Sequence, residues 1–473
     1  MSVWIKNAEI VTMDEAQGII KGSLLIEDGT ITGIYPHEQE ADAPLLSAVE
    51  VIDADWNLLI PGMSNAHYHS YSNLLKGTRS NLPLELWSLY TIAYGHSLDD
   101  EDIYLAVLLG AADMIRSGIT GCIDHFPHLL RVNSALRAYE KSQMNVTIAP
   151  MIQDVSDEEF LGFSDKKSNL LGDLSEIRDF FSNLFHNWHL KNEKIEIMLG
   201  PNAPQRCSQQ ALRLCKDLSD QFGVNVHTHL LETKIQKVIG DRTYSNGMLG
   251  HLNEAGLLNH KLSVAHAVWL DYEEMDLLKE KKVSIVHNPA SNMTLGSGVA
   301  PVSRFMKDRM LVGLGSDASN CGISHRSFEM MRLSLMLSRI NSRNYEEWLE
   351  PSDVFKMATR SGANIISGSK RGKIAEGYDA DLVLINRSSS SFILNEDLIS
   401  QLVFYENGES VEAVMIKGAW VYWEDRILAF DEQEVIRQVQ EKSSELRKKV
   451  QGALSEAEKK KRILENFYRQ FYN

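Results

Sequence analysis

Between residues 61 and 372 the chain alternates short apolar runs with longer stretches in which apolar residues recur at helical spacing. One such stretch, residues 102–117, ends at Gly118. Strands that alternate with helices form parallel sheets, because each helix returns the chain to the edge where the last strand began. The apolar runs lie before His67 and at residues 120–123, 146–150, 195–200, 224–229, 262–265, 283–286 and 310–315. Eight strands interleaved with helices predict an α/β fold, a closed (β/α)8 barrel of the TIM type.

The segments on both sides of this region have the pattern of short β-strands. Residues 23–34 contain two apolar runs around Asp28-Gly29, which is a hairpin signal, and residues 411–423 contain another hairpin pattern. We therefore expect a small β-sandwich domain built from both chain ends, residues 1–60 plus 373–430, and interrupted by the barrel over residues 61–372.

Residues 431–473 repeat apolar residues at helical spacing and predict a C-terminal helical extension. The basic run at residues 459–462 fits a solvated helix face, and a subunit contact is the alternative.

Composition limits the partners and the compartment. The formal net charge of −16 argues against a nucleic-acid surface, which requires a basic face. None of the four cysteines forms a CxxC pair, so a reducing compartment is favoured over a disulfide framework. The first residues lack a signal-peptide pattern, and no run of 18 apolar residues predicts a membrane span. We expect a cytoplasmic enzyme that does not bind membranes.

Six side chains with metal-binding or acid–base chemistry stand at or just after the ends of apolar runs: His67, His69, His229, Glu232, His266 and Asp317. The carboxyl ends of barrel strands meet at one face, so these groups are expected to converge. Histidines at i and i+2 of a strand share a face, which allows His67 and His69 to chelate one ion.

His227 and His229 repeat the same spacing and are ambiguous as ligands. Glu232 lies just past the strand end and would be near a metal-bound water, which favours His229 as the ligand. His227 is then expected behind the ligands or in the core. His266 taken alone could equally be a core histidine.

Three imidazoles and one carboxylate suit Zn2+ and also tolerate Fe2+. A bound divalent ion lowers the pKa of its water toward about 7, and the resulting hydroxide would attack the carbon of a C–N bond. Asp317 would take the proton of this water. Glu232 would protonate a ring nitrogen of the substrate and assist the leaving amine, and His266 would stabilise the developing oxyanion.

Several segments resemble the amidohydrolase superfamily, in particular its deaminase and chlorohydrolase branch. Residues 61–69 (Pro-Gly-Met-Ser-Asn-Ala-His-Tyr-His) resemble its metal-binding motif, and residues 82–87 (Leu-Pro-Leu-Glu-Leu-Trp) resemble its substrate loop. Residues 287–298 and 377–382 match two further segments, so that the resemblance covers nearly all of residues 3–430.

The resemblance implies that His67, His69, His229 and Asp317 bind the metal and that Glu232, His266 and Asp317 are catalytic. It also implies one divalent ion, because residues 195–200 lack the lysine that bridges two metals in binuclear relatives. Substrate contacts are expected from Trp87, His96, Asn202, Glu232 and His287. The expected partners are a small nitrogen heterocycle and water, and the chain is expected to form a homo-oligomer.

Two positions depart from the nucleoside-type members of this branch. Asn202 stands where those members have a histidine, and His96 stands where they have a ribose-binding glutamate. The sequence therefore favours hydrolytic deamination of an amino-substituted free base over that of a nucleoside. The alternatives are an S-adenosylhomocysteine or methylthioadenosine deaminase, a hydrolase that removes an alkylamine or chloride or opens a ring amide, and a non-catalytic metal-binding member. His325 and Arg326 follow a shortened last loop; a position at the loop surface is favoured, and a position facing the pocket is the alternative.

Overall fold

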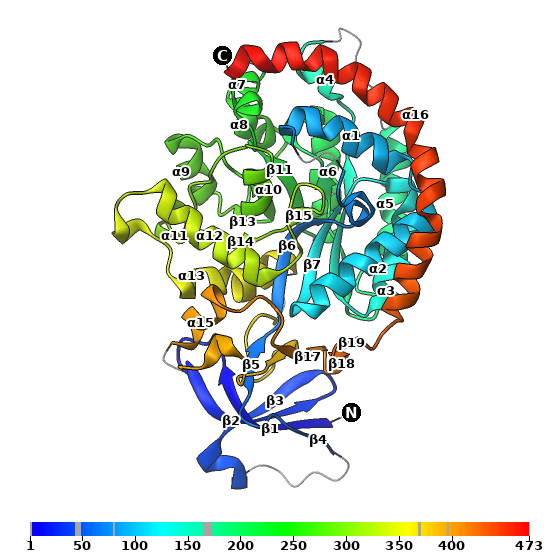
Figure 1. The fold of residues 1–473 in the computed structure, drawn as a ribbon. Helices are drawn as coiled ribbons and strands as arrows, with labels where there is room; N and C mark the ends of the chain where they lie inside the picture. Colours follow the sequence, from blue (N-terminus) through cyan, green and yellow to red (C-terminus); the bar gives the residue numbers. More distant parts are fainter. Residues whose placement is uncertain are drawn as a thin grey trace.

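The computed structural model describes residues 2–42, 49–78, 81–163, 173–367, 370–394 and 397–472. Two parallel sheets form the centre of the molecule, with strand orders β10-β8-β7-β6-β15, where β9 also pairs with β8, and β11-β12-β13-β14 (Figure 1). Their strands are β6 (Met63–His69), β7 (Ile119–Phe126), β8 (Asn145–Ile152), β9 (Ile195–Ile197), β10 (Gly200–Pro201), β11 (Val226–Leu230), β12 (Leu262–His266), β13 (Ser284–His287), β14 (Val312–Leu314) and β15 (Asp317–Ala318).

The two parallel sheets meet at both of their edges. A parallel bridge between Leu199 and Val226 joins the first sheet to β11. At the other edge, β15 follows β14 in the chain and pairs with β6 in parallel. Ala66, Ile123 and Val286 come from three of these strands and lie in one buried apolar cluster. All the strands are parallel, so their carboxyl ends lie at one edge of the structure.

Each of the eight expected apolar runs forms a strand, and two runs differ from a simple strand. The fourth is divided into β9 and β10, and Gly200 lies so close to β8 that a Cβ would be 2.6 Å from the Ala149 carbonyl oxygen. The eighth contains β14, and a further strand, β15, begins just after the run; at Gly315, between the two strands, a Cβ would lie 2.1 Å from Asn288 Oδ1.

The two ends of the chain join in one nine-stranded sheet of order β19-β18-β17-β16-β5-β1-β2-β3, with β4 beside β1. This sheet lies below the parallel strands in Figure 1. The junction between the chain ends is the antiparallel pair of β5 and β16. Both expected hairpins are present, as β2–β3 and β17–β18. The strands are β1 (Ser2–Val11), β2 (Ile19–Glu27), β3 (Thr30–Pro36), β4 (Val49–Asp53), β5 (Leu58–Pro61), β16 (Leu382–Ile385), β17 (Val411–Ile416), β18 (Ala419–Trp423) and β19 (Arg426–Ile427).

Helices connect and surround the parallel strands. The helix expected at residues 102–117 is α2, which starts at a capping box between Asp99 and Asp102. The helices are α1 (Leu84–His96), α2 (Asp100–Arg116), α3 (Val132–Ser142), α4 (Asp157–Phe160), α5 (Leu174–Trp188), α6 (Gln209–Phe222), α7 (Lys234–Thr243), α8 (Gly247–Glu254), α9 (Tyr272–Glu280), α10 (Pro289–Thr294), α11 (Val302–Lys307), α12 (Ser327–Asn341), α13 (Pro351–Lys356), α14 (Gly362–Ile366), α15 (Leu398–Phe404) and α16 (Glu432–Tyr472).

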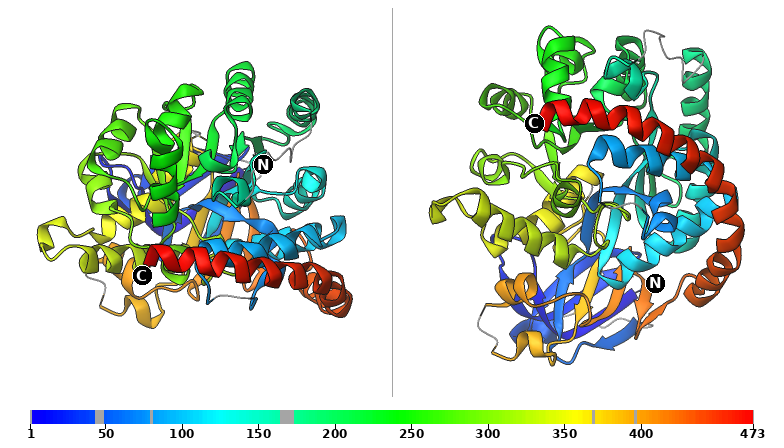
Figure 2. Two further views of the ribbon diagram at one scale, coloured as in Figure 1. Left: turned by 90° about the horizontal axis from the view of Figure 1, so that it is seen from above. Right: turned by 45° about the horizontal axis from the view of Figure 1, so that its top comes forward.

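The expected C-terminal helix is the 41-residue α16, which runs along one side of the molecule against α1 and α2 (Figure 2). Tyr90 of α1 donates a hydrogen bond to Glu458, and Lys460 lies 2.6 Å from Glu158 of α4. The helix therefore connects several elements of its own chain. Among the described residues, no helix has the length and apolar character needed to cross a membrane.

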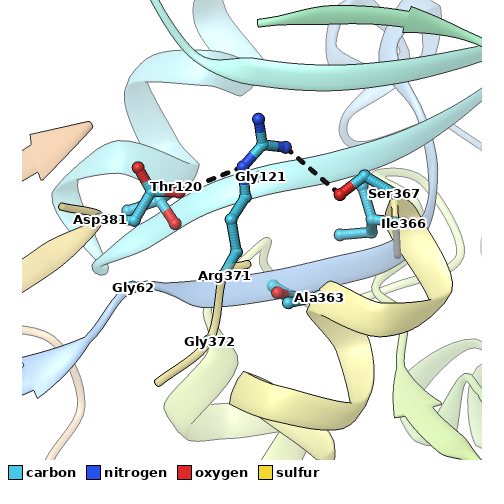
Figure 3. Close-up of a pocket in the computed structure, with 10 residues that line it drawn as sticks. Gly62, Thr120, Gly121, Ala363, Ile366, Ser367, Arg371, Gly372 and Asp381 are labelled. Atoms are coloured by element: carbon cyan, nitrogen blue, oxygen red, sulfur yellow. Dashed lines mark hydrogen bonds and ion pairs between the residues drawn. The ribbon is translucent and has the colours of Figure 1, made fainter. Parts of the chain in front are cut away.

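Arg371 occupies the junction between the composite sheet and the parallel strands, in a small cavity beside Asp381 and Ser367 (Figure 3). Its Nε lies 3.1 Å from Asp379 Oδ2 and 3.7 Å from Asp381 Oδ2, and its Nη1 lies 3.7 Å from Glu196 Oε1. Asp381 is only 2% exposed, and Asn145 donates a hydrogen bond to it from β8. One guanidinium thus joins carboxylates from both parts of the fold.

Candidate active site

The six side chains expected to converge lie together at the carboxyl ends of the parallel strands. His67 and His69 belong to β6, and His229 to β11, with Glu232 two residues past the end of that strand. His266 is the last residue of β12, and Asp317 is the first of β15. The last two have left-handed backbones, with φ of 75° and 62°. Such strain in non-glycine residues persists where the surroundings enforce it, often at functional sites.

Three imidazoles and one carboxylate of this group surround a common point. His69 Nε2 lies 3.3 Å from His229 Nε2 and 3.2 Å from Asp317 Oδ1. His67 Nε2 lies 3.7 Å from the same carboxylate oxygen. Ligand atoms of His67, His69 and His229 all lie within 4.8 Å of one another. This spacing allows one ion to contact all four side chains.

The remaining nitrogen of each imidazole is already engaged. His69 Nδ1 lies 2.6 Å from the His125 carbonyl oxygen, and His229 Nδ1 lies 2.6 Å from that of Asn202. His67 Nδ1 lies 2.8 Å from His227 Nε2. Such contacts fix the ring and leave Nε2 as the free nitrogen, which is the usual arrangement around a metal-ligating histidine.

The buried environment keeps two of these imidazoles neutral. Burial lowers the pKa of His67 to about 3, and burial together with His125 lowers the pKa of His229 well below its usual value. His67 Nε2 is buried and has no hydrogen-bond partner in the described part of the chain. A neutral imidazole with an unpartnered Nε2 is what a divalent cation requires, so the donor set fits a metal ion.

Asp317 carries a negative charge and is held at both oxygens. Burial alone would raise its pKa, but the imidazoles of His67 and His69 outweigh burial and hold the pKa well below its usual range. Oδ1 accepts a hydrogen bond from the Ala318 amide and Oδ2 accepts one from Ser291 Oγ, at 2.8 Å and 2.5 Å. Oδ1 therefore faces the imidazoles, and Oδ2 faces the rest of the site.

His266 lies between the two carboxylates. Its Nε2 is 3.6 Å from Glu232 Oε2 and 3.8 Å from Asp317 Oδ2, and its Nδ1 is 2.9 Å from Asn292 Oδ1. Glu232 is 3% exposed, and burial raises its pKa while His266 opposes that shift. A carboxyl whose pKa is raised is better suited to deliver a proton to a substrate than an ordinary carboxylate.

Two of the expected substrate contacts lie beside this group. Trp87 packs against Leu295, Ala318 and Cys321, next to Asp317. The Asn202 carbonyl holds His229, and its side-chain amide donates a hydrogen bond to Gln153 while its oxygen accepts one from Arg206.

The structure does not bring His96 and His287 into the group. His96 is exposed at the end of α1, and its ring contacts that of His128. His287 is buried but lines a small cavity with Val302 and Ser334. Its neighbour Val286 lies in the apolar cluster among the parallel strands, and consecutive residues of a strand point to opposite faces. His287 therefore faces the surrounding helices.

The expected surface position of His325 is wrong. The residue is 1% exposed, with its two ring nitrogens each 2.7 Å from a serine hydroxyl, Ser316 Oγ and Ser319 Oγ. It thus joins the two sides of the loop that carries Asp317.

Sequence reasoning also missed Glu85 and Arg206 near the site, because a glutamate in the first turn of a helix and an arginine in a loop are ordinary surface features.

The fold and this cluster define the class of protein: an α/β protein with histidine and aspartate side chains that could hold a metal ion at the carboxyl ends of its parallel strands. Residues 58–421 match the model of the amidohydrolase family. The chain belongs to the amidohydrolase family.

The chain is similar to two deaminases in sequence and to a third in fold. A 5′-deoxyadenosine deaminase of Methanosarcina mazei is 31% identical over 93% of this chain and 98% of its own length. A 5-methylthioadenosine/S-adenosylhomocysteine deaminase of Pyrococcus furiosus is 32% identical over 91% and 98%. The crystal structure of a zinc-bound adenosine deaminase from Xanthomonas campestris superimposes with a TM-score of 0.83 at 22% identity, covering 94% of this chain and 98% of that one.

Proposed function

We propose that this amidohydrolase removes an amino group hydrolytically from a nitrogen heterocycle, with one divalent metal ion as its cofactor. The observation that carries the proposal is the convergence of three Nε2 atoms and Asp317 Oδ1 on one point, with Glu232 and His266 beside them. Water replaces the amino group on the ring carbon, and the amino group leaves as ammonia.

His67, His69, His229 and Asp317 would hold the ion. Three nitrogens and one oxygen suit zinc, which is also present in the solved adenosine deaminase of similar fold, and iron stays the alternative. When bound, such an ion lowers the pKa of water toward about 7 and thereby supplies the nucleophile at neutral pH.

The chain's own residues carry the protons. Asp317 accepts a proton at Oδ2, on the side of the carboxylate that faces away from the imidazole ligands. Glu232 delivers a proton at Oε2 to a ring nitrogen of the substrate, which makes the adjacent carbon electrophilic. The leaving amine then takes up the proton that Asp317 accepted and departs as ammonia. His266, between the two carboxylates, is positioned to donate a hydrogen bond from Nε2 to the oxygen that develops charge.

The parallel strands support a closed (β/α)8 barrel over residues 61–372. The two sheets meet at both edges, through the Leu199–Val226 bridge and the β15–β6 pair. Residues 1–60 plus 373–430 would form the β-sandwich domain, by curling of the nine-stranded sheet, and residues 431–473 the helical extension. The homo-oligomer stays a prediction, as does the cytoplasmic location, which the buried, unpaired cysteines support.

The substrate is proposed to be an aminated heterocycle, and the free base remains our preferred form. That preference rests on His96, which is exposed, and on Asn202, whose side chain is engaged by Gln153 and Arg206. Adenine nucleosides are included in the test because the deaminases of M. mazei and P. furiosus carry the names of nucleoside substrates.

The test is ammonia release by zinc-loaded protein of measured metal content. The panel contains aminopurines, aminopyrimidines, pterins and aminotriazines, together with adenosine, 5′-deoxyadenosine and methylthioadenosine. Release from a free base supports the whole proposal, and release from nucleosides alone supports deamination but overturns the preferred substrate form. Silence across the panel with zinc bound overturns deamination in favour of alkylamine, chloride or ring-amide hydrolysis.

A further inference from the structure

Glu85 lies in the first turn of α1 and contacts the loop that carries the proposed proton donor. Its Oε1 accepts a hydrogen bond from Thr233 Oγ1 at 2.5 Å. Thr233 follows Glu232 directly and caps the start of α7, where its hydroxyl accepts a hydrogen bond from the Gln236 amide. The position of Glu85 is therefore fixed relative to Glu232.

The same turn of α1 contacts the loop on the other side of the site. Trp87, two residues after Glu85, packs against Ala318, the neighbour of Asp317, and against Leu295. Leu295 lies two residues before Ser297, which donates a hydrogen bond to Glu232 Oε1. The first turn of α1 thus contacts the neighbours in sequence of both Glu232 and Asp317, the two residues proposed to carry protons.

Two polar atoms of this turn are buried without a hydrogen-bond partner in the described part of the chain: Glu85 Oε2, an acceptor when ionised, and Trp87 Nε1, a donor. A buried polar group left unsatisfied costs about 1–3 kcal/mol, so such groups are rare unless a ligand or water completes them. Burial raises the pKa of Glu85 to about 7, with the Thr233 hydrogen bond opposing the shift. In the free protein, burial therefore outweighs the hydrogen bond from Thr233, and Oε2 has no hydrogen-bond partner in the described part of the chain.

We infer that Glu85 is a specificity-determining substrate residue, whose Oε2 accepts a hydrogen bond from an N–H or O–H of the substrate away from the C–N bond that breaks. This inference rests on the proposed function, because it assigns a part of the same site. The donor is either an N–H of a free base or a hydroxyl of a ribose. Either group would donate a hydrogen bond to Oε2 of the Glu85 carboxylate, whose Oε1 is held by Thr233.

The test compares binding by zinc-loaded, full-length protein of two matched pairs of compounds. Adenine and 9-methyladenine differ by a ring N–H, and adenosine and 2′,3′-dideoxyadenosine differ by the ribose hydroxyls. Dissociation constants are measured by calorimetry for wild type, Glu85→Gln and Glu273→Gln, a matched change on the exposed face of α9. Where a compound is turned over, KM and kcat are measured as well.

The expected result is that Glu85→Gln weakens binding about tenfold or more for the donor-bearing member of one pair, because a charged hydrogen bond contributes about 1.5–3 kcal/mol. Its partner without the donor should bind the variant as it binds wild type, and kcat should change by less than about twofold. The affected pair identifies the source as base or ribose. Glu273→Gln should match wild type throughout.

If Glu85→Gln does not fold, Thr233→Val tests the same point by releasing the anchored oxygen, and the same dependence on the donor is expected. Equal weakening of both members of each pair, or no weakening, would overturn the inference, as would a wild type that binds none of the four compounds. Donor-dependent binding by a protein that releases ammonia from none of the panel compounds would uphold this inference and overturn the proposed deamination.

Discussion

His227 Nε2 lies 2.8 Å from His67 Nδ1, and both rings are completely buried. If His67 binds the ion through Nε2, its Nδ1 carries the hydrogen and donates it to His227. His227 Nδ1 then donates to Ser263 Oγ at 2.8 Å, and that hydroxyl lies 3.3 Å from the Val226 carbonyl oxygen. The first histidine of the His-Thr-His motif thus holds the ring of His67, a proposed ligand on another strand.

Replacing His227 should weaken metal binding without removing a ligand. We expect His227→Ala to reduce zinc affinity by about 10–100-fold, because the loss of a partner behind a ligand has effects of that size. Competition with a chromogenic chelator measures the change, and Ser263→Ala should have a smaller effect in the same direction. Unchanged zinc affinity in His227→Ala would contradict this role.

His325 should make stability depend on pH. Burial lowers the pKa of His325 to about 4 from an ordinary value of 6.5. The unfolded chain therefore takes up a proton between these values while the folded chain does not, so stability is complete above pH 6.5 and falls as the pH drops toward 4. The loss from this residue amounts to at most about 3 kcal/mol.

The measurement compares the free energy of unfolding of wild type and His325→Asn from pH 7 to pH 4.5. The variant should be less stable at pH 7, because the serine hydroxyls lose their partner, and the difference should shrink as the pH falls. Parallel pH curves for the two proteins would show that His325 is not held neutral.

Arg371 should be critical for the junction between the composite sheet and the parallel strands (Figure 3). Arg371→Met leaves Asp381 buried without its nearest cation, and breaking a buried ion pair in this way costs about 3–5 kcal/mol. Asp379→Asn, which changes a more exposed partner, should cost less than about 1 kcal/mol. Denaturant unfolding checks both values, and similar losses in the two variants would argue against a buried pair with Asp381.

The positions of the candidate site residues could be predicted because their polar side chains stand at the ends of the apolar runs that form the strands. Each of His67, His229, His266 and Asp317 ends or follows an apolar run, and parallel strands bring their carboxyl ends to one edge. The hairpin at Asp28-Gly29 could also be predicted, because Asp-Gly is a typical turn sequence between two strands.

The direction of His287 could not be read from the sequence. Strands of a parallel sheet are buried on both faces, so Val286 and His287 give no alternation of apolar and polar residues that would distinguish the faces. The burial of His325 could not be predicted either, because it depends on tertiary contacts with Ser316 and Ser319 that the local sequence pattern does not indicate.

The surface against which α16 packs could not be predicted from the sequence pattern. Helical spacing of apolar residues predicts a helix with one buried face, but it does not say which surface covers that face. In the structure the partners are α1 and α2 of the same chain.

The central claim is that Glu232 moves a proton in a metal-dependent deamination, and the most direct test is Glu232→Gln. The best substrate from the panel is assayed for ammonia release with wild type and variant at equal, measured zinc content. We predict that the variant keeps its zinc and loses about 100-fold or more in kcat, because general acid–base catalysis contributes about 10²–10⁴-fold. A zinc-loaded Glu232→Gln that releases ammonia at the wild-type rate would contradict the claim.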